Sequence, residues 1–529
     1  LGRLLLAQGR IAEADAIFRR CLAGAVESGS AEGRWSAREG LGRIAAARGD
    51  LQGALAQLSR ALEEIEKVRA GLERTGWRAG YFGDKRSVYA AAVDVLWRLE
   101  LLHLGEGFAG QALEVSQRAK ARDLLDALGE SPAFPSAAAE IMARAGDDTL
   151  LEYFFGEERL YRWMIRRSGL RMADLGPKRP ILEAVGRVHR ELARGSEPED
   201  AAVARLSRNL LGDTISPEAE RLWIAPDGLL HYLPFEILEH PAVPRDLLVD
   251  RVAVSYLPST SARTRMKRSR PAPLRLAGFG APRSSASGTP LAPPRFKPEP
   301  LPAARRELDR IEQLLGGKSA TYTGGQATER IFRDTFARGV QVVHFATHTV
   351  LDERPGGGAA ILLSPEGEDD GLLSPREIAG IDGRADLAVL AACRTALAPR
   401  DGEDSGALVS LTGSFLAAGS SAVLATLWDV GDAAAAVFME QLYAQLGRGL
   451  PPEEALREAK LRLRADPRWN RPSLWAGYVL IGEAPPVAPP RKKLWLAGAA
   501  VLALLGLAGL AASSRRLTRR RGSRIPASA

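Results

Sequence analysis

Apolar and small side chains recur at helical spacing over the first 130 residues, and this pattern repeats after 40 positions. At that offset Gly9 aligns with Gly49 and Phe18 with Leu58. Each unit holds two amphipathic stretches, and the first ends at the glycine, a residue type common at helix C-termini. A weaker third pair spans residues 88–128. We therefore predict stacked helical pairs, whose surface suits a protein or peptide partner. A helical brace without a ligand is the alternative.

The pattern changes near residue 150, where short apolar runs replace the long amphipathic ones. Residues 151–165 indicate a hairpin, and residues 221–238 indicate a strand followed by a Pro-Asp-Gly turn. After a polar loop over 282–302, strands alternate with helices, which predicts a largely parallel sheet covered on both faces. The expected strands are 340–348, 386–393, 422–428 and 477–482, and the expected helices are 303–315, 327–337, 408–418, 433–446 and 452–465.

The last uncharged apolar run is 19 residues long and extends from Leu494 to Ala512. It follows a Pro-rich linker at 484–493. This length is close to the ~20 residues of a membrane-spanning helix. We predict a single C-terminal span at 494–513 and a basic tail at 514–529, with a buried core helix as the alternative. The chain begins with Leu rather than Met, so the side of the membrane on which the body lies stays open.

Charge is concentrated at this C-terminal end. The chain has 72 Lys+Arg and 64 Asp+Glu, a net charge of +8, and nine of the basic residues but no acidic ones lie in 491–529. Residues 1–490 therefore carry −1, which argues against nucleic-acid binding. The two cysteines, Cys21 and Cys393, exclude a disulfide framework. Cys21 aligns with Ala61 of the next repeat and is predicted to be a small packing residue.

Two of the expected strands end in residues that could together carry out nucleophilic catalysis. His348 is the last residue of VQVVHFATH and Cys393 is the last of DLAVLAAC. The carboxyl ends of parallel strands lie at one edge of a sheet, where the sites of such proteins are found. If the two strands are adjacent, a neutral imidazole can take the thiol proton and create a thiolate nucleophile. Inert packing of a buried cysteine is the alternative.

Other reaction classes lack their sequence signals. No Gly-x-Ser-x-Gly elbow is present, and no phosphate loop of the Walker type. His344 and His348 have no further cluster of metal ligands beside them. No metal and no cofactor is therefore expected.

The same residues carry a family resemblance. Five ordered motifs together resemble the CHAT domain family, caspase- and separase-like cysteine peptidases that commonly follow tetratricopeptide repeats. The motifs are APDGLLHYLPFEIL (225–238), HFATH (344–348), AACRTA (391–396), SLTGSFLAAGSSAVLATLWDVGD (410–432) and SLWAGYVLIG (473–482). The helical repeats at 1–130 are similar to tetratricopeptide repeats of somewhat long period.

The resemblance implies the roles of the site residues. His348 stands at the family's general acid/base and Cys393 at its nucleophile, and the backbone N–H groups of Thr349 and Cys393 would form the oxyanion hole. The family usually has Gly at the positions of Thr349 and Ala396. If Thr349 had to adopt a conformation that only Gly reaches cheaply, the hole would be strained. His344, on the same side of the strand as His348 but deeper, is expected to be a hydrogen-bonded core histidine.

Acidic side chains follow two of the strands at the same edge. They suggest a pocket for a basic residue before the cleaved bond, with ordinary solvated loop charges as the alternative. These residues are Asp401, Glu403, Asp404, Asp429 and Asp432.

The sequence thus predicts an α/β caspase-like sandwich after an all-α repeat superhelix, with one C-terminal transmembrane helix. The expected order is repeats at 1–130, a connecting segment at 131–199 and a CHAT-like peptidase domain at 200–483, before the linker, span and tail. The expected function is that of a single-pass membrane cysteine endopeptidase that cuts a protein substrate recognised or gated through the repeats. A catalytically impaired pseudopeptidase that scaffolds an assembly is the alternative.

Overall fold

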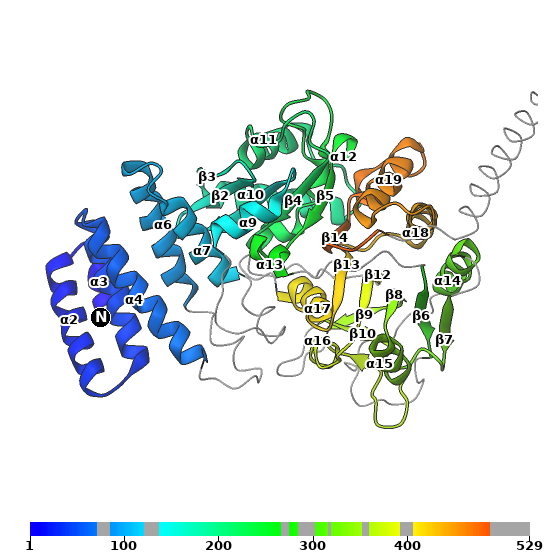
Figure 1. The fold of residues 1–529 in the computed structure, drawn as a ribbon, viewed down its shortest axis with the longest axis horizontal. Coiled ribbons are helices and arrows are strands. Elements are labelled where there is room, and N and C mark those ends of the chain that lie inside the picture. The colour runs from blue at the N-terminus through cyan, green and yellow to red at the C-terminus, as the bar shows by residue number, and fades with distance from the viewer. Residues whose placement is uncertain are drawn as a thin grey trace, which may run out of the picture.

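A computed structural model describes most of the chain (Figure 1). The described residues are 1–70, 85–120, 137–265, 274–283, 302–315, 319–351, 359–391 and 406–486. Several predicted features lie outside them, namely Cys393, Ala396, Asp401, Glu403, Asp404, the span at 494–513 and the tail at 514–529.

The N-terminal region consists of antiparallel helical pairs, as its repeat predicts. Gly9 and Gly49 follow the first helix of their pairs and have φ of 73° and 84°, the left-handed region in which a side chain is costly. The helices are α1 (Gly2–Ala7), α2 (Ile11–Glu27), α3 (Ala31–Ala47), α4 (Leu51–Ala70), α6 (Arg86–Leu102) and α7 (Phe108–Lys120).

The repeats share one packing arrangement. A Cβ built on Gly2 would lie 2.8 Å from the Phe18 ring, and one built on Gly42 would lie 2.8 Å from Leu58. Small residues 40 positions apart therefore admit equivalent apolar side chains. The prediction for Cys21 was wrong: its repeat mate Ala61 is buried, but Cys21 is exposed on α2.

Eleven strands form one continuous sheet beyond the helices, in the order β3-β2-β1-β4-β5-β14-β13-β12-β8-β6-β7. The strands are β1 (Thr149–Phe155), β2 (Arg159–Arg166), β3 (Gly169–Pro177), β4 (Arg221–Ala225), β5 (Ala253–Tyr256), β6 (Leu276–Pro282), β7 (Ala320–Gly324), β8 (Val340–Ala346), β12 (Ala385–Leu390), β13 (Ser420–Thr426) and β14 (Tyr478–Gly482). A separate small sheet contains β9 (Thr349–Leu351), β10 (Ala359–Leu362) and β11 (Leu372–Leu373).

The large sheet is parallel in its centre and antiparallel toward one edge. β1 and β2 form the predicted hairpin, with Leu151 opposite Met164. β14 runs antiparallel to β13 within the otherwise parallel centre. Residues 149–177, expected in a connecting segment, therefore contribute three strands to the same sheet as the predicted peptidase domain.

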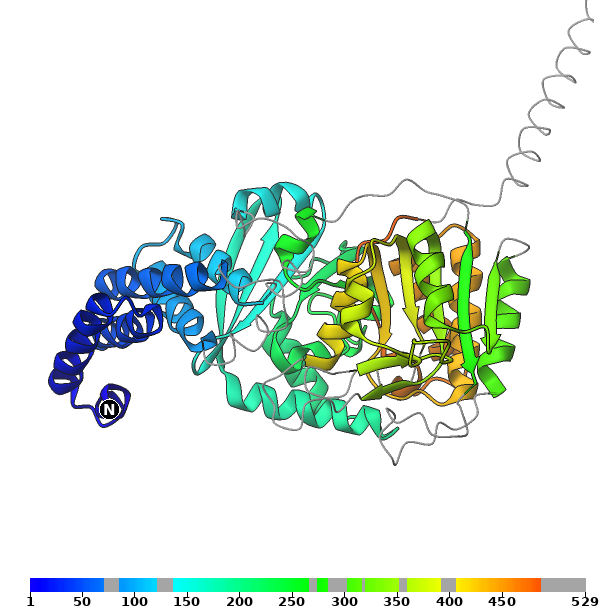
Figure 2. The same cartoon turned by 90° about the horizontal axis from the view of Figure 1, so that it is seen from below.

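Helices cover both faces of the central strands, as Figure 2 shows, and alternate residues of these strands belong to the two resulting apolar clusters. Val342 packs toward α14 (Pro302–Leu315), α18 (Asp432–Gly447) and α19 (Pro452–Ala465). Its neighbour Val343 packs toward α15 (Glu329–Arg338), α16 (Pro375–Ala379) and α17 (Gly406–Ala417). This period of two is the burial pattern of a sheet covered on both faces.

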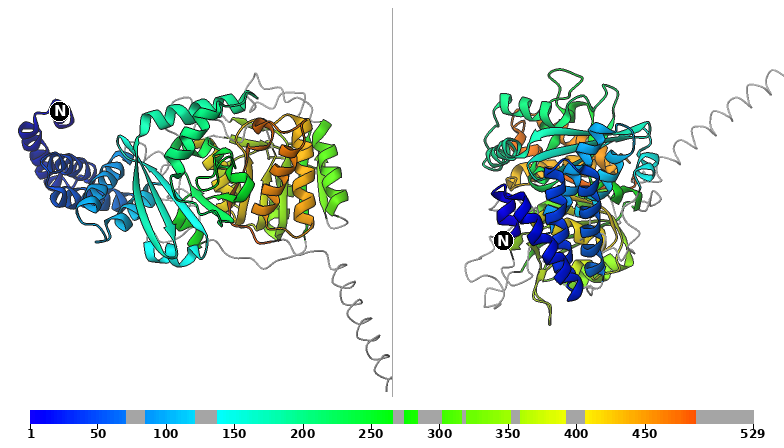
Figure 3. Two further views of the ribbon diagram at one scale, coloured as in Figure 1. Left: turned by 90° about the horizontal axis from the view of Figure 1, so that it is seen from above. Right: turned by 90° about the vertical axis from the view of Figure 1, so that its left-hand side faces the viewer.

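The remaining helices are short or lie around the antiparallel half of the sheet. The repeats project from that end of the molecule (Figure 3). These helices are α9 (Ala138–Ala145), α10 (Lys178–Ala193), α11 (Asp200–Leu211), α12 (Leu248–Arg251), α13 (Thr260–Arg265), α20 (Pro472–Trp475) and the 3₁₀ turns η1 (Gly228–Tyr232) and η2 (Phe235–Ile237).

The predicted transmembrane helix, and with it the single-pass membrane localisation, is contradicted as far as the structure describes the chain. In that part, every helix is too short or too polar to cross a bilayer. The longest of these helices, α4, has 20 residues, but it is amphipathic, so only one of its faces packs on other helices. Its charged residues are Arg60, Glu63, Glu64, Glu66, Lys67 and Arg69.

A buried polar cluster joins the repeats to the sheet. At the end of α7, Lys120 donates from Nζ to Glu152 Oε1 on β1 at 3.0 Å and to the Ala225 carbonyl at 2.9 Å. The other oxygen of Glu152 accepts from the Thr260 backbone N–H at 2.8 Å. Lys120 is 3% and Glu152 0% exposed at the side chain, so this ion pair is fully enclosed between helix and sheet.

A second polar contact at this junction predicts a pH-dependent stability. Asp94 on α6 accepts from the Glu157 backbone N–H at 3.2 Å, and burial raises the pKa of Asp94 to about 6. The folded state therefore binds more protons than the unfolded state between about pH 4 and 6, and its stability falls as the pH rises through this window. Above pH 6 the buried charge costs its full penalty.

We expect Asp94→Asn to be more stable than the wild type at pH 7, by up to about 3 kcal/mol from the size of the shift. Below about pH 4 the two proteins should be equally stable, since Asp94 is then protonated both folded and unfolded. Urea unfolding at pH 3.5, 5 and 7 measures the difference. Equal stability at all three values would contradict a buried, charged Asp94.

Candidate functional site

The positions of His348 and Cys393 follow two strands that pair directly. β8 and β12 are parallel neighbours, with His344 opposite Val389 and Phe345 opposite Leu390. His348 comes three residues after Phe345 and Cys393 three residues after Leu390, and the two strands that precede them end at the same edge of the sheet. The condition on which the sequence prediction depended, that the two strands are adjacent, is met. Cys393 itself lies outside the described residues.

The backbone around His348 is held by β10. The His348 carbonyl accepts from the Leu362 backbone N–H at 2.9 Å, and the Thr347 hydroxyl donates to the Leu362 carbonyl at 2.7 Å. His348 is half-buried. These two bonds hold Thr347 and His348, the two residues that connect β8 to β9. They limit the positions that the His348 ring can reach.

Thr349 has an extended backbone rather than one that requires glycine. Among the described residues outside glycine, positive φ occurs only at Arg245 and Ala281. Thr349 is opposite Ile361 in the antiparallel ladder, and the bond beside this pair runs from Leu362 to His348. The Thr349 N–H therefore points away from β10, because the bonded and non-bonded positions of such a ladder alternate. The strain suggested by the missing glycine does not occur.

His344 is a core residue, and its prediction as such is confirmed. It is fully buried, with Nδ1 2.9 Å from the Tyr443 hydroxyl on α18 and Nε2 2.9 Å from Glu307 Oε1 on α14. Burial raises the pKa of Tyr443 far above its ordinary value, with Glu307 adding to the effect. Both ring nitrogens are occupied, so His344 ties the sheet to two helices.

The two described acidic candidates lie on the far side of β12 from β8. Asp429 and Asp432 follow β13, the strand next to β12, and both are exposed. Asp432 is in the first turn of α18, where a carboxylate also stabilises the positive end of the helix dipole. The other three acidic candidates lie outside the described residues, and the acidic pocket stays a prediction.

A cavity that the sequence pattern does not predict opens on the opposite side of β8. It has a volume of 580 Å³ at the carboxyl ends of β6 and β7, and Arg283 and Arg305 line it. The two arginines are separated by the polar stretch over 282–302, and single arginines beside a polar loop carry no distinctive signal in a sequence.

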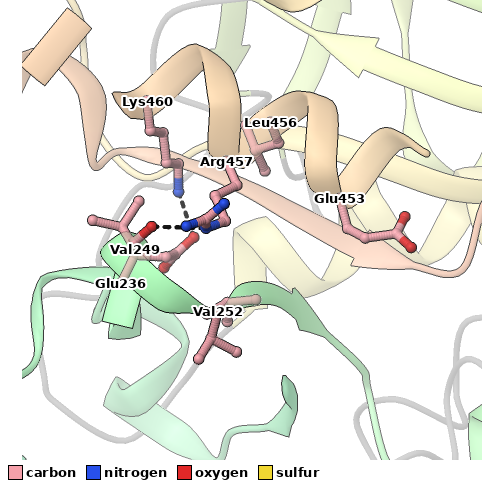
Figure 4. A pocket seen from close by; sticks show the side chains of 8 residues that line it. Glu236, Val249, Val252, Glu453, Leu456, Arg457 and Lys460 are labelled. Atoms are coloured by element: carbon pink, nitrogen blue, oxygen red, sulfur yellow. Dashed lines mark hydrogen bonds and ion pairs between the residues drawn. The ribbon is translucent and has the colours of Figure 1, made fainter. Parts of the chain in front are cut away.

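A further pocket near the segment 225–238 is structural rather than open (Figure 4). Glu236 on η2 forms a buried ion pair with Lys460 on α19 and accepts from the Tyr256 hydroxyl at 2.6 Å. Arg457 donates from Nε to the Val249 carbonyl at 2.9 Å. These contacts join the 225–238 segment to α19, so the charged side chains here support the fold.

Comparison with known proteins follows from this geometry. The CHAT domain family matches residues 195–483, more than half of the chain, and the chain belongs to this family. It is a CHAT domain protein of the caspase- and separase-like kind, preceded by helical repeats of the tetratricopeptide type.

Two curated relatives match part of this chain. Tetratricopeptide repeat protein 28 of Mus musculus is 29% identical over 219 residues, 35% of this chain and 9% of that protein. Tetratricopeptide repeat protein 28 of Homo sapiens is 25% identical over 307 residues, 50% of this chain and 12% of that protein. The chain therefore spans only a small part of the length of these relatives.

The solved structure of the Saccharomyces cerevisiae separase–securin complex has a similar fold. It matches with a TM-score of 0.51 and 11% identity over 83% of this chain and 38% of that chain. At this identity the likeness concerns the fold alone, a caspase-like α/β sheet that follows a helical region.

Proposed function

We propose that this protein is a cysteine endopeptidase in which Cys393 is the nucleophile and His348 the general acid/base. The observation that supports the proposal is the register of β8 and β12, which brings the positions after Phe345 and Leu390 out at one edge of the sheet. Membership of the CHAT family supports the same assignment.

The reaction follows from these groups. The His348 imidazole takes the proton of the Cys393 thiol, and the thiolate attacks the carbonyl carbon of the peptide bond. The backbone N–H groups of Thr349 and Cys393 stabilise the negative oxygen of the tetrahedral intermediate. His348 then gives its proton to the leaving amine, and water hydrolyses the thioester with His348 as the base.

The repeats would supply the recognition of a protein partner or substrate. Stacked helical pairs offer an extended surface, and the enclosed Lys120–Glu152 pair joins their last helix to β1. In this proposal the acidic residues at 401–404 and 429–432 would receive a basic substrate residue. The proposal would lose that pocket if peptides with Lys or Arg before the cut had no advantage.

A scaffold without catalysis is the alternative function. Its main support was the strain expected at Thr349, and the extended backbone of Thr349 removes that argument. A scaffold without catalysis is therefore one of the two outcomes that the alkylation of Cys393 distinguishes.

The test is the rate of Cys393 alkylation against pH in the full chain with Cys21→Ser, which removes the exposed thiol. We expect an inflection well below the ~8.5 of a free thiol, because a nearby imidazolium favours the thiolate. His348→Ala should return the inflection toward 8.5, and Cys393→Ser should abolish labelling. An ordinary profile that His348→Ala leaves unchanged would contradict the dyad and favour the scaffold.

A further inference from the structure

The cavity beside β8 is formed where two parallel strands end. β6 and β7 form its base, and Arg305 reaches it from the second turn of α14. Thr323 and Gln326 line it together with the turn at Gly324 and Gly325. Its volume of 580 Å³ is within the range of sites that hold a small ligand or several side chains.

A β-bulge directs Arg283 into this cavity. The register between β6 and β7 shifts between Gly280 and Pro282, and Ala281 has a φ of 44°, a strained value for a residue with a side chain. Bulges are frequent beside functional sites, where they re-aim a side chain. The strained residue, Ala281, therefore lies in the wall of the cavity.

Hydrogen bonds hold the bulge in place. The Arg283 backbone N–H donates to the Ser364 hydroxyl at 2.9 Å, and that hydroxyl donates to the Gly324 carbonyl at 2.7 Å. The Arg283 side chain passes over the glycine turn, 3.9 Å from the point where a Cβ on Gly324 or Gly325 would lie. A side chain at either position would therefore start in ordinary van der Waals contact with Arg283.

Within the described residues, the positive charge of the cavity has no counter-charge. Arg283 and Arg305 are both exposed, and within the described part of the chain neither guanidinium has a carboxylate partner. The described lining residues include no Asp or Glu. Elsewhere, exposed arginines such as Arg310 and Arg330 pair with carboxylates. Two guanidinium groups on one cavity attract a carboxylate, to which each can donate two hydrogen bonds.

The cavity adjoins the proposed catalytic edge. Gly280, at the end of β6, is opposite Ala346, two residues before His348. The order of strands at this edge is therefore β13, β12, β8, β6 and β7. A peptide lying across the edge at Cys393 and His348 would meet the exposed Asp429 and Asp432 beyond β12 on one side and the arginine cavity on the other.

We propose that this cavity is a substrate subsite for an acidic side chain, with Arg283 and Arg305 binding its carboxylate. The proposal deepens the proposed function, since it names a substrate class for the same site: protein segments that carry Asp or Glu at a set distance from the cleaved bond. It is a specificity site, and neither arginine takes part in bond cleavage.

The experiment measures binding without cleavage. The full chain with Cys393→Ala is titrated with fluorescent, end-blocked hexapeptide libraries in which one position at a time is Glu or Gln. At one position we expect the Glu library to bind about tenfold more tightly, a difference of about 1.4 kcal/mol, because a carboxylate can form charged hydrogen bonds with the arginines and an amide cannot. The Arg283→Gln, Arg305→Gln double variant should lose this preference. Arg306→Gln, the exposed neighbour on α14 outside the cavity lining, should retain it.

Two results would overturn the subsite: equal binding of Glu and Gln libraries at every position, or a Glu preference that persists in the double variant. The proposed peptidase is judged separately by the alkylation of Cys393, which needs no peptide. A low thiol inflection with no Glu preference would leave the peptidase standing and reject the subsite. A Glu preference that depends on both arginines, beside an ordinary thiol, would keep the acidic binding site and reject cleavage.

Discussion

Replacing His348 by Ala is expected to lower the kcat for peptide hydrolysis by about 10²–10⁴-fold, the usual contribution of a general acid/base. Cys393→Ala should remove hydrolysis altogether, because no other thiol of the chain lies at this edge of the sheet: Cys21 is on α2. The loss has a physical cause in two steps. Without the imidazole the thiol stays protonated at pH 7, and the leaving amine has no proton donor.

His344 provides the matched control on the same strand. It lies four residues before His348, but both its ring nitrogens are bonded to Tyr443 and Glu307 in the core. His344→Asn should therefore lower the unfolding temperature while leaving the pH profile of Cys393 alkylation unchanged at 15 °C. An equal loss of thiol reactivity in both histidine variants would mean that the assignment of His348 is wrong.

Replacing Glu152 by Ala is expected to destabilise the protein by about 3–5 kcal/mol. The change leaves the Lys120 ammonium enclosed without its counter-charge, and a broken buried ion pair costs about this much. Lys120 keeps two carbonyl acceptors, Tyr153 and Ala225. These hydrogen bonds do not replace the lost negative charge.

The double variant Lys120→Met, Glu152→Gln tests the cause. It removes both charges, so it should recover most of the stability lost in Glu152→Ala. The measurement is urea unfolding followed by the fluorescence of Trp163 and Trp223, which are buried in the apolar cluster shared by the repeats and the sheet. Glu13→Ala breaks the exposed pair with Arg10 and should leave the stability nearly unchanged. A Glu152→Ala variant as stable as Glu13→Ala would show that the junction does not depend on this pair.

The helices and central strands could be predicted closely because their signals are local. The helix predicted at 452–465 is α19 (Pro452–Ala465), and the strand predicted at 422–428 is β13 (Ser420–Thr426). The hydrophobic period and the turn residues determine these elements, and both signals are contained in a short stretch of sequence. The repeat offset of 40 likewise aligned Phe18 with Leu58, and in the structure these side chains contact Gly2 and Gly42, which are also 40 positions apart.

Burial of single residues was less predictable. Cys21 and Ala61 occupy equivalent repeat positions, but only Ala61 is covered by a neighbouring helix. Membership of the large sheet was also missed for residues 149–177, since a hairpin has the same local pattern whichever sheet edge it joins. These differences arise from contacts between segments distant in the chain.

The sequence by itself determined the repeat, the alternation of strands and helices, the family motifs and the two reactive residue types, because each depends on near neighbours or on residue identity. Only the tertiary structure decided that β8 and β12 are adjacent in a register that aligns the positions before His348 and Cys393. It also decided that Arg283 and Arg305, 22 positions apart, line one cavity. Strand order and the lining of the cavity result from packing between segments that are distant in the chain. This packing produces no periodic pattern in the sequence.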